Sequence, residues 1–305
     1  MGLRERISRA ISDPHRGARF VNRHLGAPIY RMVNPSSNFF DEDWDNLVIL
    51  DGCRYDYLKD YQSEFREGEF DSRISPASSS LEFVRKVTEA SDLRDVVWVT
   101  ANPWIDEAEE SIFKVFNVWT DGWNDDLKTV HPRVLSDEAL QVVEDYPNKR
   151  IVVHFMQPHY PFIGEFGREN LPKHRSFTGA GKIVNLDGRD IWELLRTGEV
   201  ERSTVEKAYR ENLELVIPYT LDLVDSLLGR TVITADHGNE FGTRTWPLPI
   251  KIFGHPSGFR TEGLVKVPWI VFSNGERREI RPGPLGEKTN DGVTKEDRLE
   301  ALGYI

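Results

Sequence analysis

Five short apolar runs rich in valine and isoleucine constrain the fold of this chain more than any other feature. Runs of this length and composition are typical of strands that are buried on both faces of a sheet. Helical patterns separate them, and strands that alternate with helices predict a parallel sheet with right-handed crossovers, the α/β class. The expected strands are residues 47–50, 96–100, 150–154, 231–235 and 268–272, and the expected helices are residues 81–90, 137–145 and 201–228.

The remaining pattern predicts a basic arm at residues 1–40, a main domain at 41–275 and a tail with a short helix at 276–305. Residues 164–200 are rich in glycine and charge with weak periodicity, which indicates an insertion or lid over the sheet edge. Pro218 lies inside the longest helical segment and is expected to kink or divide it, because proline lacks the backbone N–H.

Charge is distributed unevenly along the sequence. The formal net charge is −11, yet residues 1–32 hold seven arginines against two acidic residues. An acidic chain is a poor general binder of nucleic acid, whose phosphates require a basic surface. The basic segment is either an arm that docks on an anionic surface such as a membrane, or a solvated helix packed on the acidic body.

Several absences bear on the expected location of the protein. Cys53 is the single cysteine, so no internal disulfide can form. No apolar run reaches the roughly 18–20 residues that span a bilayer, and the N-terminus lacks the apolar core of a secretory signal. We therefore expect a cytoplasmic protein.

Acidic residues end two of the expected strands. Asp51 follows residues 47–50, and Asp236 with His237 follows residues 231–235. Open α/β sheets place ligands at the carboxyl ends of their strands, and carboxylates with an imidazole suit a divalent metal. Asp51 could instead be a turn or N-cap residue, but the pair on the other strand favours a metal site.

Three serines precede the expected helix at residues 81–90. Ser79 and Glu82 fit a capping box, which places Ser80 in the first turn beside unpaired backbone N–H groups. That position stabilises an alkoxide and binds phosphate or sulfate oxygens, so Ser80 is the candidate nucleophile of a metal-activated reaction. Ser78 and Ser79 are the alternatives, and serines that only cap the helix are the other interpretation.

Two loop histidines are candidates for further roles. His159 lies in a proline-flanked turn after a strand, where it could protonate a leaving group, bind substrate oxygens or ligate a second metal. His255 lies between Gly254 and Pro256 and offers another accessible imidazole, with an ordinary turn histidine as the alternative. His154, inside a strand, is expected to be a buried structural histidine.

Taken in order, these motifs resemble the alkaline phosphatase/sulfatase superfamily over residues 45–273. The resemblance implies a three-layer α/β/α sandwich with a mostly parallel central sheet, of which residues 41–275 would be the catalytic domain. The matching pieces are Asp51 with Arg54 and Asp56, the serines 78–80, His159-Tyr160-Pro161, Asp236-His237-Gly238, and Gly254-His255 followed by Val267-Pro268-Trp269-Ile270-Val271.

The resemblance also implies roles for the site residues. A metal would be held by Asp51, Asp236 and His237, with Ser80 bound to it. His159 would contact the substrate, and His255 would do the same or ligate a second ion, which makes one or two ions in all.

Two departures from the family pattern narrow the expected chemistry. The segment after Ser80 lacks the Cys-x-Pro-x-Arg motif of formylglycine sulfatases, and Cys53 does not match that position. Gly52 stands where sulfatases have a second aspartate, so one ligand of a calcium-type site is missing. Both favour Zn or Mn over Ca or Mg, and phosphate esters over sulfate esters.

The expected function is a metal-dependent hydrolase of phosphate or sulfate esters that uses a serine nucleophile. One alternative is a transferase of phosphoalcohol headgroups in lipid or surface-glycan assembly, with peripheral membrane contact through residues 1–32. Another is an inactive member that acts as a binding module, against which the retained ligand set argues. Fold resemblance alone does not identify the substrate.

Overall fold

A seven-stranded sheet in the order β2-β13-β10-β1-β7-β3-β4 forms the centre of the molecule. The computed structural model describes residues 14–172, 177–178, 182–183 and 190–285. The strands of the sheet are β1 (Asn46–Leu50), β2 (Glu69–Ile74), β3 (Leu93–Thr100), β4 (Ile112–Asn117), β7 (Arg150–Phe155), β10 (Gly229–Thr234) and β13 (Lys266–Asn274).

Strand β1 is central, and all five of its residues are buried. It pairs in parallel with β10 on one side and with β7 on the other, and β7, β3 and β4 continue the parallel series. Strands covered on both faces need continuous apolar sequence, which is why these runs stand out.

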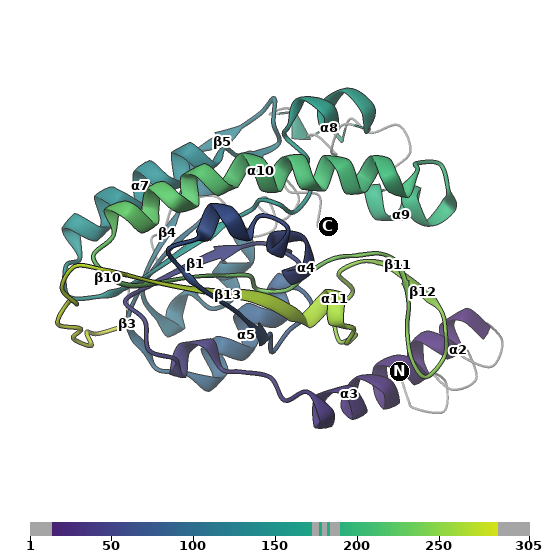
Figure 1. The fold of residues 1–305 in the computed structure, drawn as a ribbon, viewed down its shortest axis with the longest axis horizontal. Helices are drawn as coiled ribbons and strands as arrows, with labels where there is room; N and C mark the ends of the chain where they lie inside the picture. Colours follow the sequence, from purple (N-terminus) through teal and green to yellow (C-terminus); the bar gives the residue numbers. More distant parts are fainter. Residues whose placement is uncertain (1–13, 173–176, 179–181, 184–189, 286–305) are drawn as a thin grey trace.

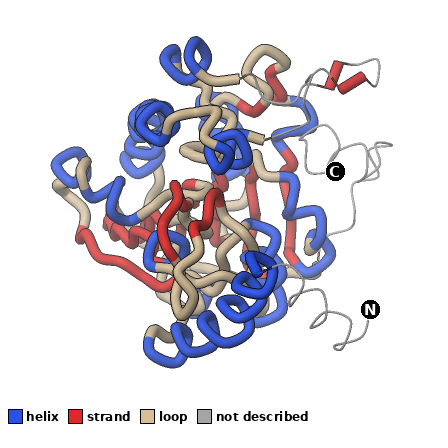
Figure 2. The backbone as a smooth tube through the Cα atoms, turned by 90° about the vertical axis from the view of Figure 1, so that its right-hand side faces the viewer, coloured by secondary structure: helices blue, strands red, loops and turns tan. Residues whose placement is uncertain are grey.

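Helices cover both faces of the sheet. The long helices α7 (Pro132–Asp145) and α10 (Arg202–Ser226) lie side by side over one face, and α5 (Ser80–Ala90) covers the other (Figure 1). Figure 2 shows the same layering from the edge, with helices above and below the strands. The predicted α/β sandwich with a mostly parallel sheet is confirmed.

The structure differs from the sequence prediction at the sheet edge beyond β10. Strand β13 runs antiparallel to β10, although the expected strand at 268–272 was assigned to the parallel set. The edge strands β2 and β4 were not expected, because β2 alternates charged and apolar residues and Lys114 interrupts β4.

The helices differ from the prediction in extent. Pro218 does not divide α10, which is continuous, and α7 begins earlier than expected, at Pro132, where the His131 side chain accepts a hydrogen bond from the N–H of Arg133. The expected C-terminal helix at 295–302 and residues 1–13 of the arm lie outside the described residues.

Smaller elements connect the main ones. The described residues of the segment expected to be an insertion, 164–200, form two helices and a short strand pair. The remaining elements are α4 (Tyr55–Lys59), α6 (Val118–Asp121), α8 (Glu165–Asn170), α9 (Ile191–Thr197), α11 (Glu262–Val265), β5 (Trp123–Asn124), β6 (Thr129–Val130), β8 (Phe177–Thr178), β9 (Lys182–Ile183), β11 (Glu240–Arg244) and β12 (Lys251–Gly254), with short helices η2 (Phe39–Asp41), η3 (Gln62–Phe65), η4 (Pro103–Glu107) and η5 (Glu109–Ser111).

The described part of the basic segment packs on the body of the protein. It forms α2 (Pro14–Val21), the π-helix η1 (Asn22–Gly26) and α3 (Ala27–Val33), which lie beside the β11–β12 hairpin (Figure 1). The amide of Asn22 donates to Thr245 Oγ1 at 2.6 Å and to the carbonyl of Leu248 at 2.7 Å, and accepts from the N–H of Leu248. Among the described helices, none has the length and apolar content needed to cross a bilayer.

Candidate active site

The carboxyl ends of the three central strands bring two carboxylates and an imidazole together. Asp51 directly follows β1, Asp236 follows the end of β10, and His154 lies in β7. Ile49 in β1 is in register with Thr234 of β10 and with His154 of β7. The parallel register therefore places Asp51 and Asp236 at one level, two residues beyond His154, near the same edge of the sheet.

This cluster contains buried polar atoms that the protein itself does not satisfy. Asp51 Oδ1, Asp236 Oδ2 and His154 Nε2 have no hydrogen-bond partner among the described residues. His154 Nε2 lies 3.8 Å from Asp51 Oδ2 and 3.9 Å from Asp236 Oδ2. Buried polar groups without partners are costly, and a cation bound between them would remove that cost. Asp51, His154 and Asp236 could thus hold a metal ion.

The neighbouring groups orient the Asp236 carboxylate. Its Oδ1 accepts hydrogen bonds from the backbone N–H of Gly52 at 3.0 Å and of His237 at 2.9 Å. Those two bonds leave Oδ2 directed toward the cluster, where it lies 3.3 Å from His237 Nε2.

His237 presents a lone pair to the cluster. Its Nδ1 lies 2.8 Å from the carbonyl oxygen of Gly238. Because a carbonyl only accepts, Nδ1 carries the proton, and Nε2 of the neutral ring is free to accept a hydrogen bond or bind a metal.

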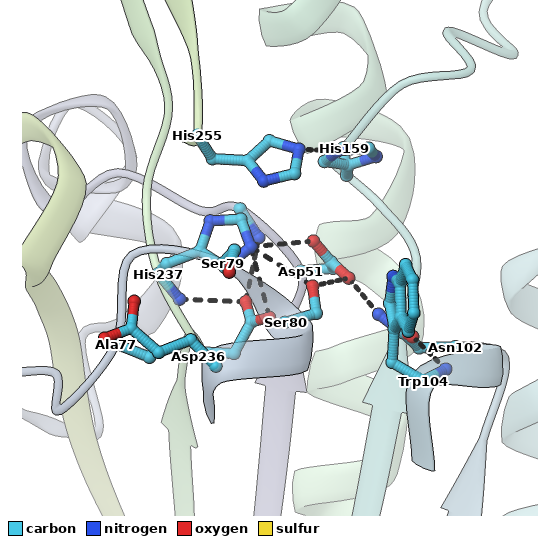
Figure 3. Close-up of polar contacts among 12 residues, drawn as sticks. Asp51, Ala77, Ser79, Ser80, Asn102, Trp104, His159, Asp236, His237 and His255 are labelled. Atoms are coloured by element: carbon cyan, nitrogen blue, oxygen red, sulfur yellow. Dashed lines mark hydrogen bonds and ion pairs between the residues drawn. The ribbon is translucent and has the colours of Figure 1, made fainter. Parts of the chain in front are cut away.

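Ser80 is the first residue of α5, and its hydroxyl points into this cluster (Figure 3). Its Oγ lies 3.1 Å from Asp51 Oδ2 and 3.1 Å from His237 Nε2. Both partners accept hydrogen bonds, so the hydroxyl proton has a basic acceptor on either side.

The hydroxyls of the other two serines bond to groups other than Asp51 and Asp236. Ser79 Oγ hydrogen-bonds Ser257 Oγ at 2.6 Å, and Ser78 donates through both N–H and Oγ to Glu82 at 3.1 Å. The expected capping box between Ser79 and Glu82 is therefore wrong in detail. Glu82 reaches one residue further back, because the Ser79 side chain is turned toward the loop that carries Ser257.

His159 and His255 form a second group beside the first. Their Nε2 atoms are 2.7 Å apart, so the two rings share one proton between them. His159 Nδ1 lies against its neighbouring carbonyl at Tyr160, and the backbone N–H of His159 donates to the carbonyl of Asp51 at 3.1 Å. The ring of His255 stacks on that of His237, with centroids 4.6 Å apart, which joins the two groups.

Burial changes the protonation of the whole cluster. Burial raises the pKa of Asp51 well above its ordinary value, and the charge of Asp236 raises it further. Burial opposes ionisation of Asp236 too, but His237 and His154 outweigh it and lower that pKa. Burial lowers the pKa of His154 to about 4 and that of His255 well below its ordinary value, so both rings are neutral at pH 7.

The structure also gives a physical reason for glycine after Asp51. Gly52 has φ +65°, and a Cβ there would lie 2.5 Å from Asn239 Nδ2, which donates to the Gly52 carbonyl at 3.1 Å. An aspartate does not fit this turn without displacing Asn239, so the departure from the sulfatase pattern is built into the packing.

Two residues of the cluster were not among the predicted site residues. His154 was expected to be structural, because a histidine inside an apolar strand gives no local signal of function. Asn102 follows β3 and donates to Asp51 Oδ2, while its Oδ1 accepts from the N–H of Trp104. Its position just after a strand of the parallel sheet was the one available clue.

No protein-family model matches the chain, and no curated protein matches it. Among solved structures, the C-terminal periplasmic domain of phosphoethanolamine transferase EptC from Campylobacter jejuni is 13% identical, over 75% of this chain and 78% of that chain, with a TM-score of 0.45. The lipoteichoic acid synthase LtaP from Listeria monocytogenes is 13% identical over 88% and 80%, with a TM-score of 0.45. A 2-O GAG sulfatase is 10% identical over 79% and 66%, with a TM-score of 0.48.

A protein in the alkaline phosphatase superfamily from Vibrio parahaemolyticus also matches, at 12% identity over 81% of this chain and 64% of that chain with a TM-score of 0.39, and this superfamily is the one that the sequence motifs resemble. The expected cytoplasmic location is contradicted, because the matched EptC domains are periplasmic. The absence of an apolar leader or span in a sequence was too weak a basis for that expectation.

Proposed function

We propose that this protein is a metal-dependent enzyme that cleaves phosphate esters, with sulfate esters as the lesser alternative, through a nucleophilic Ser80. The observation that carries the proposal is the position of Ser80 Oγ, 3.1 Å from both Asp51 Oδ2 and His237 Nε2. Unsatisfied oxygens of two buried carboxylates lie beside it.

The residues present suit a divalent cation that binds nitrogen as well as oxygen ligands. Asp51, Asp236, His237, Ser80 and the additional imidazole of His154 offer mixed oxygen and nitrogen ligands, which favours Zn or Mn over Ca or Mg. A divalent cation bound there supplies charge neutralisation for the ester oxygens and lowers the pKa of the serine hydroxyl.

The reaction is a double displacement at phosphorus. Ser80 Oγ passes its proton to Asp51 Oδ2 or His237 Nε2, each 3.1 Å away, and attacks, so that an Oγ–P bond forms while the bond from phosphorus to the substrate's alcohol oxygen breaks. The first-turn N–H groups of α5 favour negative charge on the ester oxygens. Water then attacks phosphorus, the Oγ–P bond breaks, the Ser80 oxygen takes back the proton from that acceptor, and free phosphate leaves.

The leaving alcohol needs a proton, and the paired rings of His159 and His255 are the source we propose. Their Nε2 atoms are 2.7 Å apart, so an additional proton on the pair would be shared by both rings, and the pair acts as the acid in that protonated form. His255 also stacks on His237, so the pair stands next to the nucleophile rather than in a remote loop.

Transfer to an alcohol is the second candidate function. A cavity of about 880 Å³ is lined by Tyr160 and Pro161, the two residues that follow His159 in the sequence, while the residues of the cluster itself do not line it. Such a space could hold the leaving alcohol and afterwards an acceptor alcohol in place of water. The distribution of product between free phosphate and a new ester, measured with increasing glycerol, distinguishes hydrolysis from transfer.

The test uses p-nitrophenyl phosphate and bis(p-nitrophenyl) phosphate with the metal-depleted protein and added Zn or Mn. Activity should require the metal and disappear in Ser80→Ala. Ser79→Ala is the matched control, because it removes the adjacent hydroxyl, which contacts Ser257 instead. Full activity in Ser80→Ala would exclude the assigned nucleophile.

A further inference from the structure

Exposed apolar side chains gather at one end of the molecule. Six of the nine large apolar residues that are exposed in the described part of the chain lie on η1, α3 and the tip of the β11–β12 hairpin. Met32 is 84% exposed, Val33 74% and Trp246 62%. We call these six residues the apolar end surface: Leu25, Ile29, Met32, Val33, Trp246 and Leu248.

The two segments that carry this surface form one unit. A Cβ on Gly26 would lie 2.4 Å from the carbonyl oxygen of Trp246, so the helix backbone packs directly on the hairpin tip. Asn22 bonds both ways to Leu248, as described above. Side chains from both segments line a hollow of about 310 Å³, including Ile29, Val33 and Trp246.

The two segments that carry this surface hold charged side chains of one sign, although Glu262 of α11 lies near Tyr30 of α3. Residues 14–35 and 241–251 contain no aspartate or glutamate, whereas the whole chain has a formal net charge of −11. Four basic residues of these segments are exposed, Arg23, Arg31, Arg244 and Lys251. An apolar ridge of this kind, flanked by basic residues and carrying a tryptophan, has the chemistry of a surface that enters the interface of an anionic bilayer.

A second copy of the chain fits this surface less well. A two-fold symmetric contact would bring each patch against itself, which opposes arginine and lysine on one copy to the same residues on the other. An anionic lipid surface instead accepts the apolar side chains and neutralises the basic ones.

We propose that the apolar end surface docks the protein onto an anionic bilayer. Strand β12 runs from the hairpin tip to Gly254, directly before His255. If the hairpin tip docks on the bilayer, the four residues of β12 separate it from His255, so the candidate active site lies near the lipid headgroups. The inference stands on the surface alone and does not depend on which ester is cleaved.

Flotation with vesicles tests the proposal, using phosphatidylcholine alone and phosphatidylcholine mixed with phosphatidylglycerol. The full chain should float with the anionic vesicles, and more weakly as salt is raised. Met32→Asp with Val33→Asp should lower the partition coefficient at least about tenfold. Val134→Asp with Leu228→Asp, which alters two exposed apolar residues on other elements, should leave it unchanged.

Two further measurements make the outcome decisive. Brominated lipids should quench tryptophan fluorescence in the wild type and less in Trp246→Phe. Ser80→Ala should still bind vesicles, so loss of esterase activity and loss of docking are separable. The proposal is overturned if the wild type does not float or if the Met32/Val33 variant floats equally well. It is also overturned if sedimentation shows that the wild type is a dimer and that the substitutions convert it to a monomer without changing vesicle binding.

Discussion

Replacing His154 by leucine separates a metal-binding role from a structural one, because the two roles predict opposite effects on stability. Both ring nitrogens of His154 are buried without a partner among the described residues. Leucine has a similar size and no polar atoms. In metal-free protein we therefore expect His154→Leu to be more stable than the wild type by about 1–3 kcal/mol, the cost of an unsatisfied buried group.

With metal present, the same substitution should have the opposite effect. Loss of a ligand that weakens binding at least about tenfold removes about 1.4 kcal/mol or more of metal-induced stabilisation. Urea unfolding of both proteins, with a chelator and with saturating Zn or Mn, measures the stability of the metal-free protein and the added stability from the metal separately. The quantity of interest is the difference between the metal-induced shifts of wild type and variant.

A control in the same core guards against a general packing effect. Trp98 Nε1 is also buried without a partner among the described residues, and the ring lies beside His154. Trp98→Phe should change the stability of the metal-free protein and leave the metal-induced shift unchanged. If His154→Leu destabilises the metal-free protein and preserves the full shift, the ligand role of His154 is refuted.

Three other substitutions follow from the structure. Gly52→Ala should cost about 2–4 kcal/mol in urea unfolding, because it combines a positive φ with displacement of Asn239. Asn102→Ala should weaken metal binding about 10–100-fold in competition with a chromogenic chelator, because Asp51 loses the amide that orients it; unchanged affinity would argue against that role. Burial raises the pKa of Glu82, but a lysine and backbone N–H groups outweigh it and hold the pKa at about 2. This depressed pKa stabilises the fold above pH 4.5 and the effect is lost as the pH falls toward 2, so the stability difference between wild type and Glu82→Gln should shrink over that range.

The sequence predicted the central strands of the fold. Strands β1, β3, β7 and β10 are buried on both faces, so their composition alone identified them. Edge strands bury less and tolerate charge, as the sequences of β2 and β4 do, and they were missed for that reason. The direction of β13 depends on the connection from β10, which contains a hairpin and the four-residue helix α11 in place of a long crossover helix.

The residue types of the candidate site were likewise visible in the sequence, because acids at strand ends and serines before a helix follow local rules. Asp51, Asp236, His237 and Ser80 all came from such patterns. What no pattern contained was the lateral order of the strands. In the sheet, β7 pairs with β1. This pairing brings His154, a residue inside a strand, next to Asp51 and so into the cluster. Tertiary packing likewise paired His159 with His255 and set η1 on the hairpin tip. Those contacts join segments whose separation in sequence says nothing about their distance in space.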